Sequence, residues 1–283
     1  MAAPKPVVLC ILDGWGLSDV TEANAPHLAH TPAFDRIMAT CPNARLTTHG
    51  TDVGLPAGQM GNSEVGHMNI GAGRVVAMDL GQIDLAIESG AFFENDALQA
   101  FIAALKDTGG TAHLMGLVSD GGVHGSLDHL NAAVKAITDA GVPVVIHAMT
   151  DGRDVAPSSA EGFVANLEAH LPDNATIGTV VGRYFAMDRD KRWDRVAQAY
   201  DADITDEFIL PHVIEGFDGI RDGDGVFCLN FRADRAREIL AAIGDPDFSD
   251  FDTGPRPKLA GLLGMVEYSD SHNASMTTAY PKQ

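Results

Sequence analysis

Short apolar runs, each followed by a loop rich in glycine and aspartate and then by a helical stretch, recur along this chain. Their Val, Ile and Leu content predicts strands at residues 7–12, 113–118, 144–149, 176–181, 226–229 and 258–265. Apolar spacing predicts helices at residues 31–38, 126–140, 158–170, 191–200 and 234–242. Strands that alternate with helices form right-handed βαβ units. The sequence therefore predicts an α/β fold, with a mostly parallel sheet covered by helices on both faces.

Charged residues follow nearly every predicted strand of this chain. In open parallel sheets, ligands bind at the carboxyl ends of the strands. Aspartate and glycine are also common turn formers, so one such loop carries little information. Five of them together indicate a binding site at this edge of the sheet.

The composition excludes several classes of protein. A formal charge of −20, from 19 Lys and Arg against 39 Asp and Glu, argues against nucleic acid as a partner because phosphate backbones need basic surfaces. No apolar run approaches the roughly 18 residues of a membrane span, and the first residues lack a signal-peptide pattern. Cys10, Cys41 and Cys228 are scattered and odd in number. This pattern disfavours disulfides and a cysteine zinc site, and favours a reducing cytoplasm.

Arginines concentrate in the loops that follow the predicted strands. The chain has 13 arginines, and five of them lie in these loops: Arg153, Arg183, Arg189, Arg232 and Arg235. The guanidinium group offers a planar set of donors that matches phosphate and carboxylate. Solvated surface ion pairs are the alternative for each one. Their concentration in an acidic chain favours a specific anion pocket.

A glycine-rich stretch, GQMGNSEVGH at residues 58–67, surrounds Ser63. A serine at the start of a helix can present its Oγ and backbone N–H groups to an anion, and a divalent metal would activate that oxygen as a nucleophile. The glycine spacing differs from the G-x-S-x-G nucleophile elbow. The alternative is a turn in which Ser63 only caps the helix.

Three further strand-end residues are candidates for the site. Asp13 follows the first predicted strand, where a rigid backbone would hold its carboxylate as a metal ligand, although it could also cap a turn. His124 follows a glycine pair and titrates near neutral pH, so it can donate to a phosphate or carry a proton, unless it is a surface histidine. Asp154 flanks Arg153, where it could bind hydroxyl groups or hold the guanidinium.

Six segments, taken in order, resemble those of one known family: ILDGWG, QMGNSEVGH, GLVSDGGVH, TDGRD, GRYFAMDRD and NFRADRAREI. They are similar to the cofactor-independent (2,3-bisphosphoglycerate-independent) phosphoglycerate mutases, which belong to the alkaline phosphatase-like metalloenzymes. The resemblance covers nearly the whole chain. It implies an isomerase of glycolysis and gluconeogenesis that interconverts 3-phosphoglycerate and 2-phosphoglycerate through a phosphoserine. It also implies two divalent metal ions, usually Mn²⁺, and no 2,3-bisphosphoglycerate.

The resemblance also implies roles for individual positions. Ser63 matches the serine that takes the phosphoryl group and, with Asp13, binds one metal. Asp154 would bind the glycerate hydroxyls and act as a proton shuttle, while the arginines hold the carboxylate and phosphate as glycerate reorients. The residues matched to substrate binding are His124, Arg153, Asp154, Arg183, Arg189, Arg232 and Arg235.

The family pattern suggests how the chain is divided. Residues 1–78 would be the N-terminal part of the metal-binding phosphatase-like domain, 79–267 the substrate-binding (phosphotransferase) domain, and 268–283 the start of the return to the phosphatase-like domain. Residues 79–267 contain enough βα units to fold alone, whereas residues 1–78 do not. Family members are considerably longer, and they usually carry some tens of residues between Tyr200 and Thr205, where only 201–204 stand here.

We therefore expect the N-terminal portion of a cytoplasmic, monomeric phosphoglycerate mutase that acts on a small molecule, without nucleic acid or membrane partners. One alternative is a non-catalytic phosphoglycerate-binding module, and another is a related metal-dependent phosphatase that releases phosphate to water. Asp13 and Ser63 alone cannot hold two divalent ions. This keeps open that the 283 residues by themselves are inactive.

Overall fold

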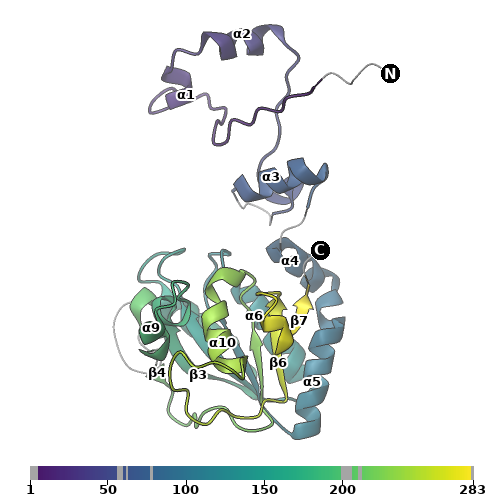
Figure 1. Ribbon diagram of the computed structural model, residues 1–283, viewed down its shortest axis with the longest axis vertical. Helices are drawn as coiled ribbons and strands as arrows, with labels where there is room; N and C mark the ends of the chain where they lie inside the picture. The colour runs from purple at the N-terminus through teal and green to yellow at the C-terminus, as the bar shows by residue number, and fades with distance from the viewer. Residues whose placement is uncertain are drawn as a thin grey trace. The chain divides into compact units, whose positions relative to one another are not determined.

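The computed structural model describes residues 6–55, 60–61, 63–76, 79–198, 206–209 and 212–281. By its internal contacts the chain forms two compact units, Met1–Gly81 and Gln82–Gln283. Figure 1 labels some of the elements of each unit. The end of the helix predicted at 191–200 lies outside the described residues.

The first unit is built from short helices. They are α1 (Ala25–Leu28), α2 (Pro32–Thr40), the 3₁₀ helix η1 (Gly50–Val53) and α3 (Ser63–Ala72). The helix predicted at 31–38 is confirmed as α2, with Thr31 at the N-cap and Pro32 at the first helical position. The Thr31 hydroxyl donates to Asp35 Oδ1 at 3.0 Å, inside the first turn of the helix.

The strand predicted at residues 7–12 is wrong, because this segment has no regular secondary structure. Val7 and Val8 are 95% and 86% exposed. A strand needs a neighbouring strand to pair its N–H and C=O groups, and the described residues of the first unit include none. An apolar run therefore predicts a buried strand only when such a neighbour is present.

The second unit contains a seven-stranded sheet in the order β4-β3-β2-β1-β5-β6-β7. All neighbouring strands are parallel except β4, which is antiparallel to β3. The strands are β1 Ala112–Leu117, β2 Val144–Thr150, β3 Ala175–Gly182, β4 His212–Val213, β5 Gly225–Cys228, β6 Gly261–Val266 and β7 Thr277–Tyr280. Five of them confirm the strands predicted from residue 113 onward. The edge strands β4 and β7 were not predicted, because two and four residues are too short for a periodic pattern.

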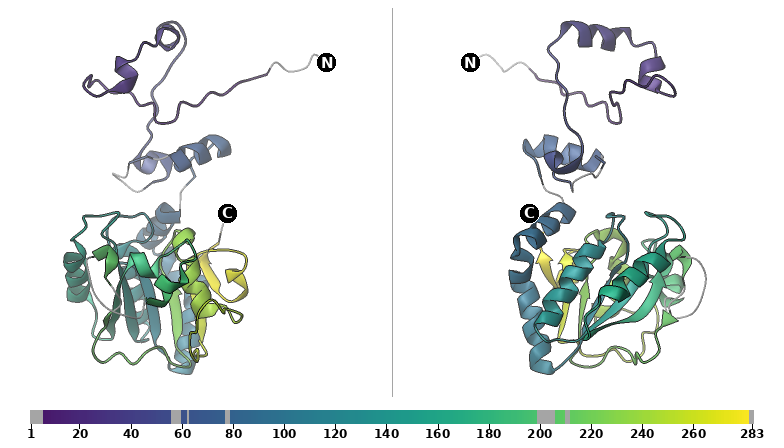
Figure 2. Two further views of the ribbon diagram at one scale, coloured as in Figure 1. Left: turned by 60° about the vertical axis from the view of Figure 1, so that its left-hand side comes forward. Right: turned by 180° about the vertical axis from the view of Figure 1, so that it is seen from behind.

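Helices cover both faces of this sheet, as the α/β prediction requires. Figures 1 and 2 show α5 and α6 on one face and α10 on the other. The helices of this unit are α4 Asp79–Ser89, η2 Ala91–Glu94, α5 Asp96–Thr108, α6 Leu127–Asp139, α7 Ala160–His170, α8 Arg183–Ala186, α9 Trp193–Gln198, η3 Asp206–Phe208, η4 Ala233–Arg235, α10 Arg237–Gly244 and η5 His272–Ala274. Asn95 caps α5 by accepting from the N–H groups of Ala97 and Leu98, each at 3.1 Å.

The core of the second unit runs across the middle of the sheet. Ile146, Leu114, Phe227 and Leu263 are register partners on four adjacent strands, and each is fully buried. Burying each such side chain stabilises the fold by about 1.5–3 kcal/mol. This rigid row holds the strand ends, and so the loops that follow them, in fixed positions.

The strand order reverses at the centre of the sheet. From β1 the chain adds β2, β3 and β4 on one side, and β5, β6 and β7 on the other. The switch point therefore lies between the carboxyl ends of β1 and β5, where ligands bind in sheets of this kind. Asn230, just after β5, joins these two ends because its Oδ1 accepts from the Leu117 N–H at 3.0 Å.

The unit boundary at Gly81 lies close to residue 78, but the assignment of residues 1–78, 79–267 and 268–283 to family domains stays a prediction. β7 belongs to the sheet of the second unit through its pairing with β6. Within the described residues, no helix has both the length and the apolar character that crossing a membrane requires.

Candidate anion-binding site

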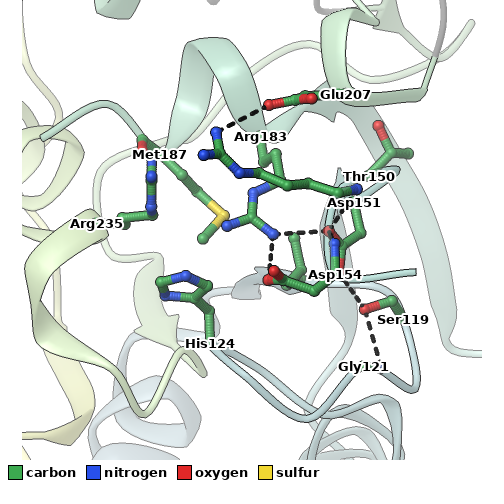
Figure 3. A network of polar contacts seen from close by, with 12 residues as sticks. Ser119, Gly121, His124, Thr150, Asp151, Asp154, Arg183, Met187, Glu207 and Arg235 are labelled. Atoms are coloured by element: carbon green, nitrogen blue, oxygen red, sulfur yellow. Dashed lines mark hydrogen bonds and ion pairs between the residues drawn. The ribbon is translucent and has the colours of Figure 1, made fainter. Parts of the chain in front are cut away.

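Four loops meet at the carboxyl ends of β1, β2, β3 and β5. They bring together residues that are far apart in the sequence, from Ser119 after β1 to Arg235 after β5, and Figure 3 shows this cluster from close by. The topology thus places the predicted strand-end residues at one edge of the sheet. The side chains there form a connected network of hydrogen bonds and ion pairs.

Asp151 is the anchor of this network and is only 1% exposed. Its Oδ2 accepts from the Ser119 hydroxyl at 2.7 Å, and its Oδ1 accepts from Arg183 Nη1 at 2.7 Å. Burial alone would raise the pKa of this carboxyl, but the Asp154 N–H, the Ser119 hydroxyl and Arg183 together hold it below its ordinary value. Asp151 is therefore ionised at neutral pH despite its burial.

The loop from Asp151 to Asp154 owes its shape to the same carboxylate. Asp151 Oδ1 accepts from the backbone N–H groups of Arg153 at 3.1 Å and Asp154 at 2.9 Å. Gly152 has φ +63°, a left-handed conformation that favours glycine. The sequence Asp-Gly-Arg-Asp thus folds locally into a turn that presents Arg153 and Asp154.

Arg183 is 2% exposed and compensates two carboxylates at once. Its Nη1 donates to Asp151 Oδ1 at 2.7 Å and to Asp154 Oδ2 at 2.5 Å. Burial lowers the pKa of this guanidinium, but the two carboxylates outweigh it and raise the pKa. Because a buried charge is tolerated only when it is paired, this triad fixes the geometry of the site.

His124 is buried beside the triad and is 4% exposed. Burial first, and then the positive charge of Arg183, lowers the pKa of its imidazole to about 4. Its Nδ1 lies 3.7 Å from Asp234 Oδ1, which is beyond hydrogen-bond distance. Its backbone carbonyl accepts from the Phe231 N–H at 2.9 Å, which ties the β1 loop to the end of β5. A neutral imidazole is thus held in place, and its buried Nδ1 has no hydrogen-bond partner among the described residues.

Asp234, near His124, is paired with two arginines. Its Oδ2 accepts from Arg189 Nη1 at 3.0 Å, and its Oδ1 lies 3.4 Å from Arg232 Nε. Burial raises the pKa of this carboxyl, but Arg189 and the neighbouring positive charges have the larger effect and bring the pKa below its ordinary value. Asp234 is therefore ionised at neutral pH. Both arginines are about half-exposed, so their remaining donors are free to meet a ligand.

Arg235 completes the positive side of the site. Its Nη1 donates to the Met187 carbonyl at 3.1 Å rather than to a carboxylate. Burial, followed by the charges of Arg189, Arg183 and Arg153, lowers its pKa. Mutual repulsion of this kind means that a bound anion would be stabilised by several cations together. Figure 3 shows the Arg235, Arg183 and His124 side chains gathered around one region.

The structure places all seven residues matched to substrate binding at this edge of the sheet, although their roles stay predictions. They are His124, Arg153, Asp154, Arg183, Arg189, Arg232 and Arg235. Arg153 lies at the exposed margin of the site. Its Nη1 is 3.4 Å from Glu207 Oε1, and its side chain is 56% exposed. Sequence reasoning did not single out Ser119, Asp234 or Glu207. Ser119 directly follows a predicted strand and Asp234 begins the helix predicted at residues 234–242, so their position near strand ends was a usable signal.

Arg232 and Arg235 are three positions apart, but Arg232 lies outside the short helix that contains Arg235. Arg232 is the N-cap of the short 3₁₀ helix η4, and α10 begins only at Arg237. The two guanidinium groups therefore have different partners, Asp234 and the Met187 carbonyl. They diverge because the backbone of Arg232 is extended, with φ −101° and ψ 117°, so helical spacing does not apply between the two residues.

In the first unit, Asp13 and Ser63 lie side by side although 50 positions separate them. The Ser63 hydroxyl donates to Asp13 Oδ2 at 2.7 Å, and His67 Nδ1 lies 3.2 Å from the same hydroxyl oxygen. Ser63 is exposed and is the first residue of α3, as the glycine-rich stretch predicts. Gly58, Gln59 and Asn62 of that stretch lie outside the described residues.

The donors at this serine do not complete a metal site. Across the described residues, no group of three or more His, Cys, Asp and Glu side chains is arranged to hold a metal ion. Asp13 and Ser63 supply two oxygens, whereas Mn²⁺ and similar ions favour octahedral sets of oxygen and nitrogen donors. The expectation of two divalent ions therefore does not fit the described side chains.

Comparisons with known proteins agree with this architecture. The family profile described as BPG-independent PGAM N-terminus matches residues 83–204 and 198–270. Two relatives, both named 2,3-bisphosphoglycerate-independent phosphoglycerate mutase, come from Ruegeria sp. (strain TM1040) and Ruegeria pomeroyi and are 67% and 68% identical. A crystal structure of Leishmania mexicana phosphoglycerate mutase at low cobalt concentration superposes with a TM-score of 0.70 at 32% identity, over 90% of this chain and 54% of that one.

The alignments with both Ruegeria relatives include 100% of this chain and 60% of each relative, so the chain spans about 60% of their length. The alignment with the TM1040 relative runs over 306 positions, against 283 residues here. The two segments matched by the family profile meet at residues 198–204. Both observations agree with the expected absence of a stretch after Tyr200, in a part of the chain that lies outside the described residues.

Proposed function

This chain belongs to the family of 2,3-bisphosphoglycerate-independent phosphoglycerate mutases, and we propose that it takes part in the interconversion of 3-phosphoglycerate and 2-phosphoglycerate. The observation that carries the proposal is the site at the carboxyl ends of β1, β2, β3 and β5. There Arg183 is buried between two carboxylates, and Arg189, Arg232 and Arg235 lie in the same group of strand-end loops as a neutral His124.

Phosphoglycerate carries a phosphate and a carboxylate, and both suit guanidinium donors. Arg189, Arg232 and Arg235 would bind these two anionic groups, because their charges are only partly compensated by Asp234 and a backbone carbonyl. His124 would donate a neutral hydrogen bond. Asp154, held by Arg183, would bind the glycerate hydroxyls and carry a proton between them. Preorganised groups of this kind stabilise the developing charge of phosphoryl transfer.

Ser63 is the proposed phosphoryl acceptor. In the first half of the reaction the bond between phosphorus and one glycerate oxygen breaks as the bond to Ser63 Oγ forms. In the second half the other glycerate hydroxyl oxygen takes the phosphoryl group back, and Ser63 is regenerated. The hydrogen bond from Ser63 Oγ to Asp13 Oδ2 supports this role because it orients the hydroxyl. The resemblance adds a requirement for divalent metal, usually Mn²⁺.

Cellular context is part of the same proposal. The three cysteines are free thiols, and Cys10 and Cys41 are exposed, as suits a reducing cytoplasm. We propose that the protein is a monomer. We also propose that it works without 2,3-bisphosphoglycerate, which the names of the two Ruegeria relatives say of those proteins. The net charge of −20 again argues against nucleic acid as a partner.

A direct test uses the 283-residue protein with 3-phosphoglycerate, with and without Mn²⁺. Calorimetry should detect binding, and substitution of exposed Arg221, paired with Asp218, by methionine should leave it unchanged. Failure of the wild-type protein to bind 3-phosphoglycerate would refute the substrate assignment. Binding without turnover would favour the non-catalytic module, and faster release of inorganic phosphate than formation of 2-phosphoglycerate would favour a phosphatase.

The acceptor assignment is tested in a chain that has mutase activity. Ser63→Ala should abolish the interconversion and the incorporation of phosphate into the protein, whereas Ser18→Ala, at another exposed serine of the first unit, should not. Retained mutase activity in Ser63→Ala would exclude a phosphoserine at this position.

A further inference from the structure

Arg189 lies on a short loop between α8 and α9 that has an unusual backbone conformation. Lys191, two residues further on, has φ +56°, a left-handed conformation rare for a residue with a side chain. Such a conformation is less favourable than the ordinary one, because it brings Cβ close to the following carbonyl oxygen. It persists only where surrounding contacts require it. The structure shows what those contacts are.

Asp188 provides the first of them from within the loop. It is 5% exposed, and its Oδ2 accepts from the backbone N–H groups of Asp190 at 3.0 Å and Arg192 at 2.9 Å. Burial raises the pKa of this carboxyl, but the two N–H groups, the Glu238 side chain and the charge of Arg195 hold it below its ordinary value. Asp188 thus closes the loop on itself.

Glu238 provides the contact from outside the loop. It lies in the first turn of α10, is 8% exposed, and its Oε1 accepts from the Lys191 N–H at 2.8 Å. Together with Asp188, it therefore accepts from three consecutive backbone N–H groups, at residues 190, 191 and 192. Its Oε2 has no hydrogen-bond partner among the described residues. Burial and the nearby Asp188 raise the pKa of Glu238.

The segment that contains Glu238 also joins the loop between α8 and α9 to the anion-binding site. Arg235, three residues before Glu238, donates to the Met187 carbonyl at the start of the loop. The loop is therefore held at both ends by the segment that contains η4 and α10. Arg189 itself reaches Asp234 of that segment.

We propose that Glu238 is a positioning residue that holds Arg189 in place to bind the anion of the substrate. It acts through the Lys191 backbone and touches neither the site nor the ligand. This inference rests on the proposed function, since it assumes that Arg189 binds phosphoglycerate. A merely structural role, in which Glu238 stabilises the N-terminal turn of α10 through the helix dipole, is the competing explanation.

Substitutions of Glu238 separate these two explanations. Glu238→Ala removes the acceptor. Glu238→Asp keeps the charge but is one methylene too short to reach the Lys191 N–H, which guards against a misfolded alanine variant. Glu238→Gln keeps the acceptor oxygen and removes the charge repulsion with Asp188. Glu168→Ala, at an exposed glutamate of α7, is the matched control.

Calorimetric titration with 3-phosphoglycerate should show about tenfold weaker binding for Glu238→Ala and Glu238→Asp, because a displaced arginine loses about one charge-assisted hydrogen bond. Glu238→Gln and Glu168→Ala should bind like the wild type. In an Arg189→Ala background, Glu238→Ala should cause no further loss, since there is no arginine left to position. The proposal would be overturned if Glu238→Ala bound 3-phosphoglycerate as tightly as the wild type. It would also be overturned if Glu238→Ala weakened binding as much in the Arg189→Ala background as in the wild type.

Hydrogen exchange gives a readout that does not depend on the ligand. The backbone amides of residues 190–192 should exchange faster in Glu238→Ala, while the β1 and β2 amides keep their wild-type rates. Unchanged exchange at 190–192 would also overturn the proposal. If the wild-type protein does not bind 3-phosphoglycerate, the proposed function fails, and the exchange rates still decide whether Glu238 holds this loop.

Discussion

Replacement of Arg183 by methionine removes the cation that compensates two carboxylates, at a position that is 2% exposed. Methionine fills most of the volume of the arginine side chain, so the change isolates the charge from the packing. Asp154 is 20% exposed and can recover water, but Asp151 is 1% exposed and cannot. The stability that the Arg183→Met variant loses therefore arises mainly from Asp151, which stays buried without its compensating cation.

Removing one partner of a buried ion pair costs about 3–5 kcal/mol. Asp151 keeps its bonds to the Ser119 hydroxyl and to two backbone N–H groups, which places the expected loss near the lower end, about 3 kcal/mol. A domain of about 150–250 residues shifts its melting temperature by about 2–4 °C per kcal/mol, so Arg183→Met should unfold roughly 6–12 °C below the wild type.

The difference in stability between Arg183→Met and the wild type should change with pH in a defined direction. In the wild type the pKa of Asp151 is lowered on folding, so its contribution to stability is present above the unfolded value of about 3.9 and is lost as the pH falls below it. Without Arg183 the pKa of Asp151 rises, and less stability is lost on acidification. The gap between variant and wild type should therefore be widest near pH 7 and narrow below about pH 4.

Thermal unfolding followed by circular dichroism between pH 3.5 and 7 measures these effects. Asp151→Asn in the Arg183→Met background removes the uncompensated charge and should recover part of the loss. Arg221→Met, at a surface pair with Asp218, should change stability by less than about 0.5 kcal/mol. A shift under about 2 °C for Arg183→Met at pH 7, or no recovery in the double variant, would refute the reasoning.

Two further predictions concern the rest of the site. The His124 imidazole should stay neutral until about pH 4, as nitrogen chemical shifts would report, and its pKa should rise in Arg183→Met because the Arg183 charge helps to lower it; titration near pH 6.5 would contradict this burial argument. Arg235→Met should weaken binding of 3-phosphoglycerate by about tenfold, because one charge-assisted hydrogen bond is lost. Raising the salt concentration should then affect the variant less than the wild type, and an unchanged dissociation constant would remove Arg235 from the binding set.

The strands that build the site could be predicted because their residues are buried on both faces of the sheet. Continuous runs such as 144–149 and 226–229 carry that signal without any knowledge of the fold. The run at 7–12 carries the same signal, yet it forms no strand, and Val7 is 95% exposed. Residue composition cannot show whether a neighbouring strand is present to pair with.

The histidines illustrate the same limit. His113, at the start of β1, bonds with His147 and Asp224 across the sheet, whereas His124 lies in the anion site. Burial is the main cause that lowers the pKa of both His113 and His147. The pKa of His147 falls to about 3. Sequence spacing pointed to His124 because it follows a strand end, but the pairing of His113 depends on which strands become neighbours.

The sequence by itself determined the alternation of strands and helices, the clustering of arginines after strands, and the family to which the chain is similar. These properties are local, because each depends on residues within one segment. Tertiary structure alone decided that Arg183 is compensated by Asp151 and Asp154, that Asp13 meets Ser63, and that Glu238 holds the loop of Arg189. These are contacts between segments 29 or more positions apart. They form because strand order and loop direction bring the groups together, and because a buried charge is stable only beside its partner.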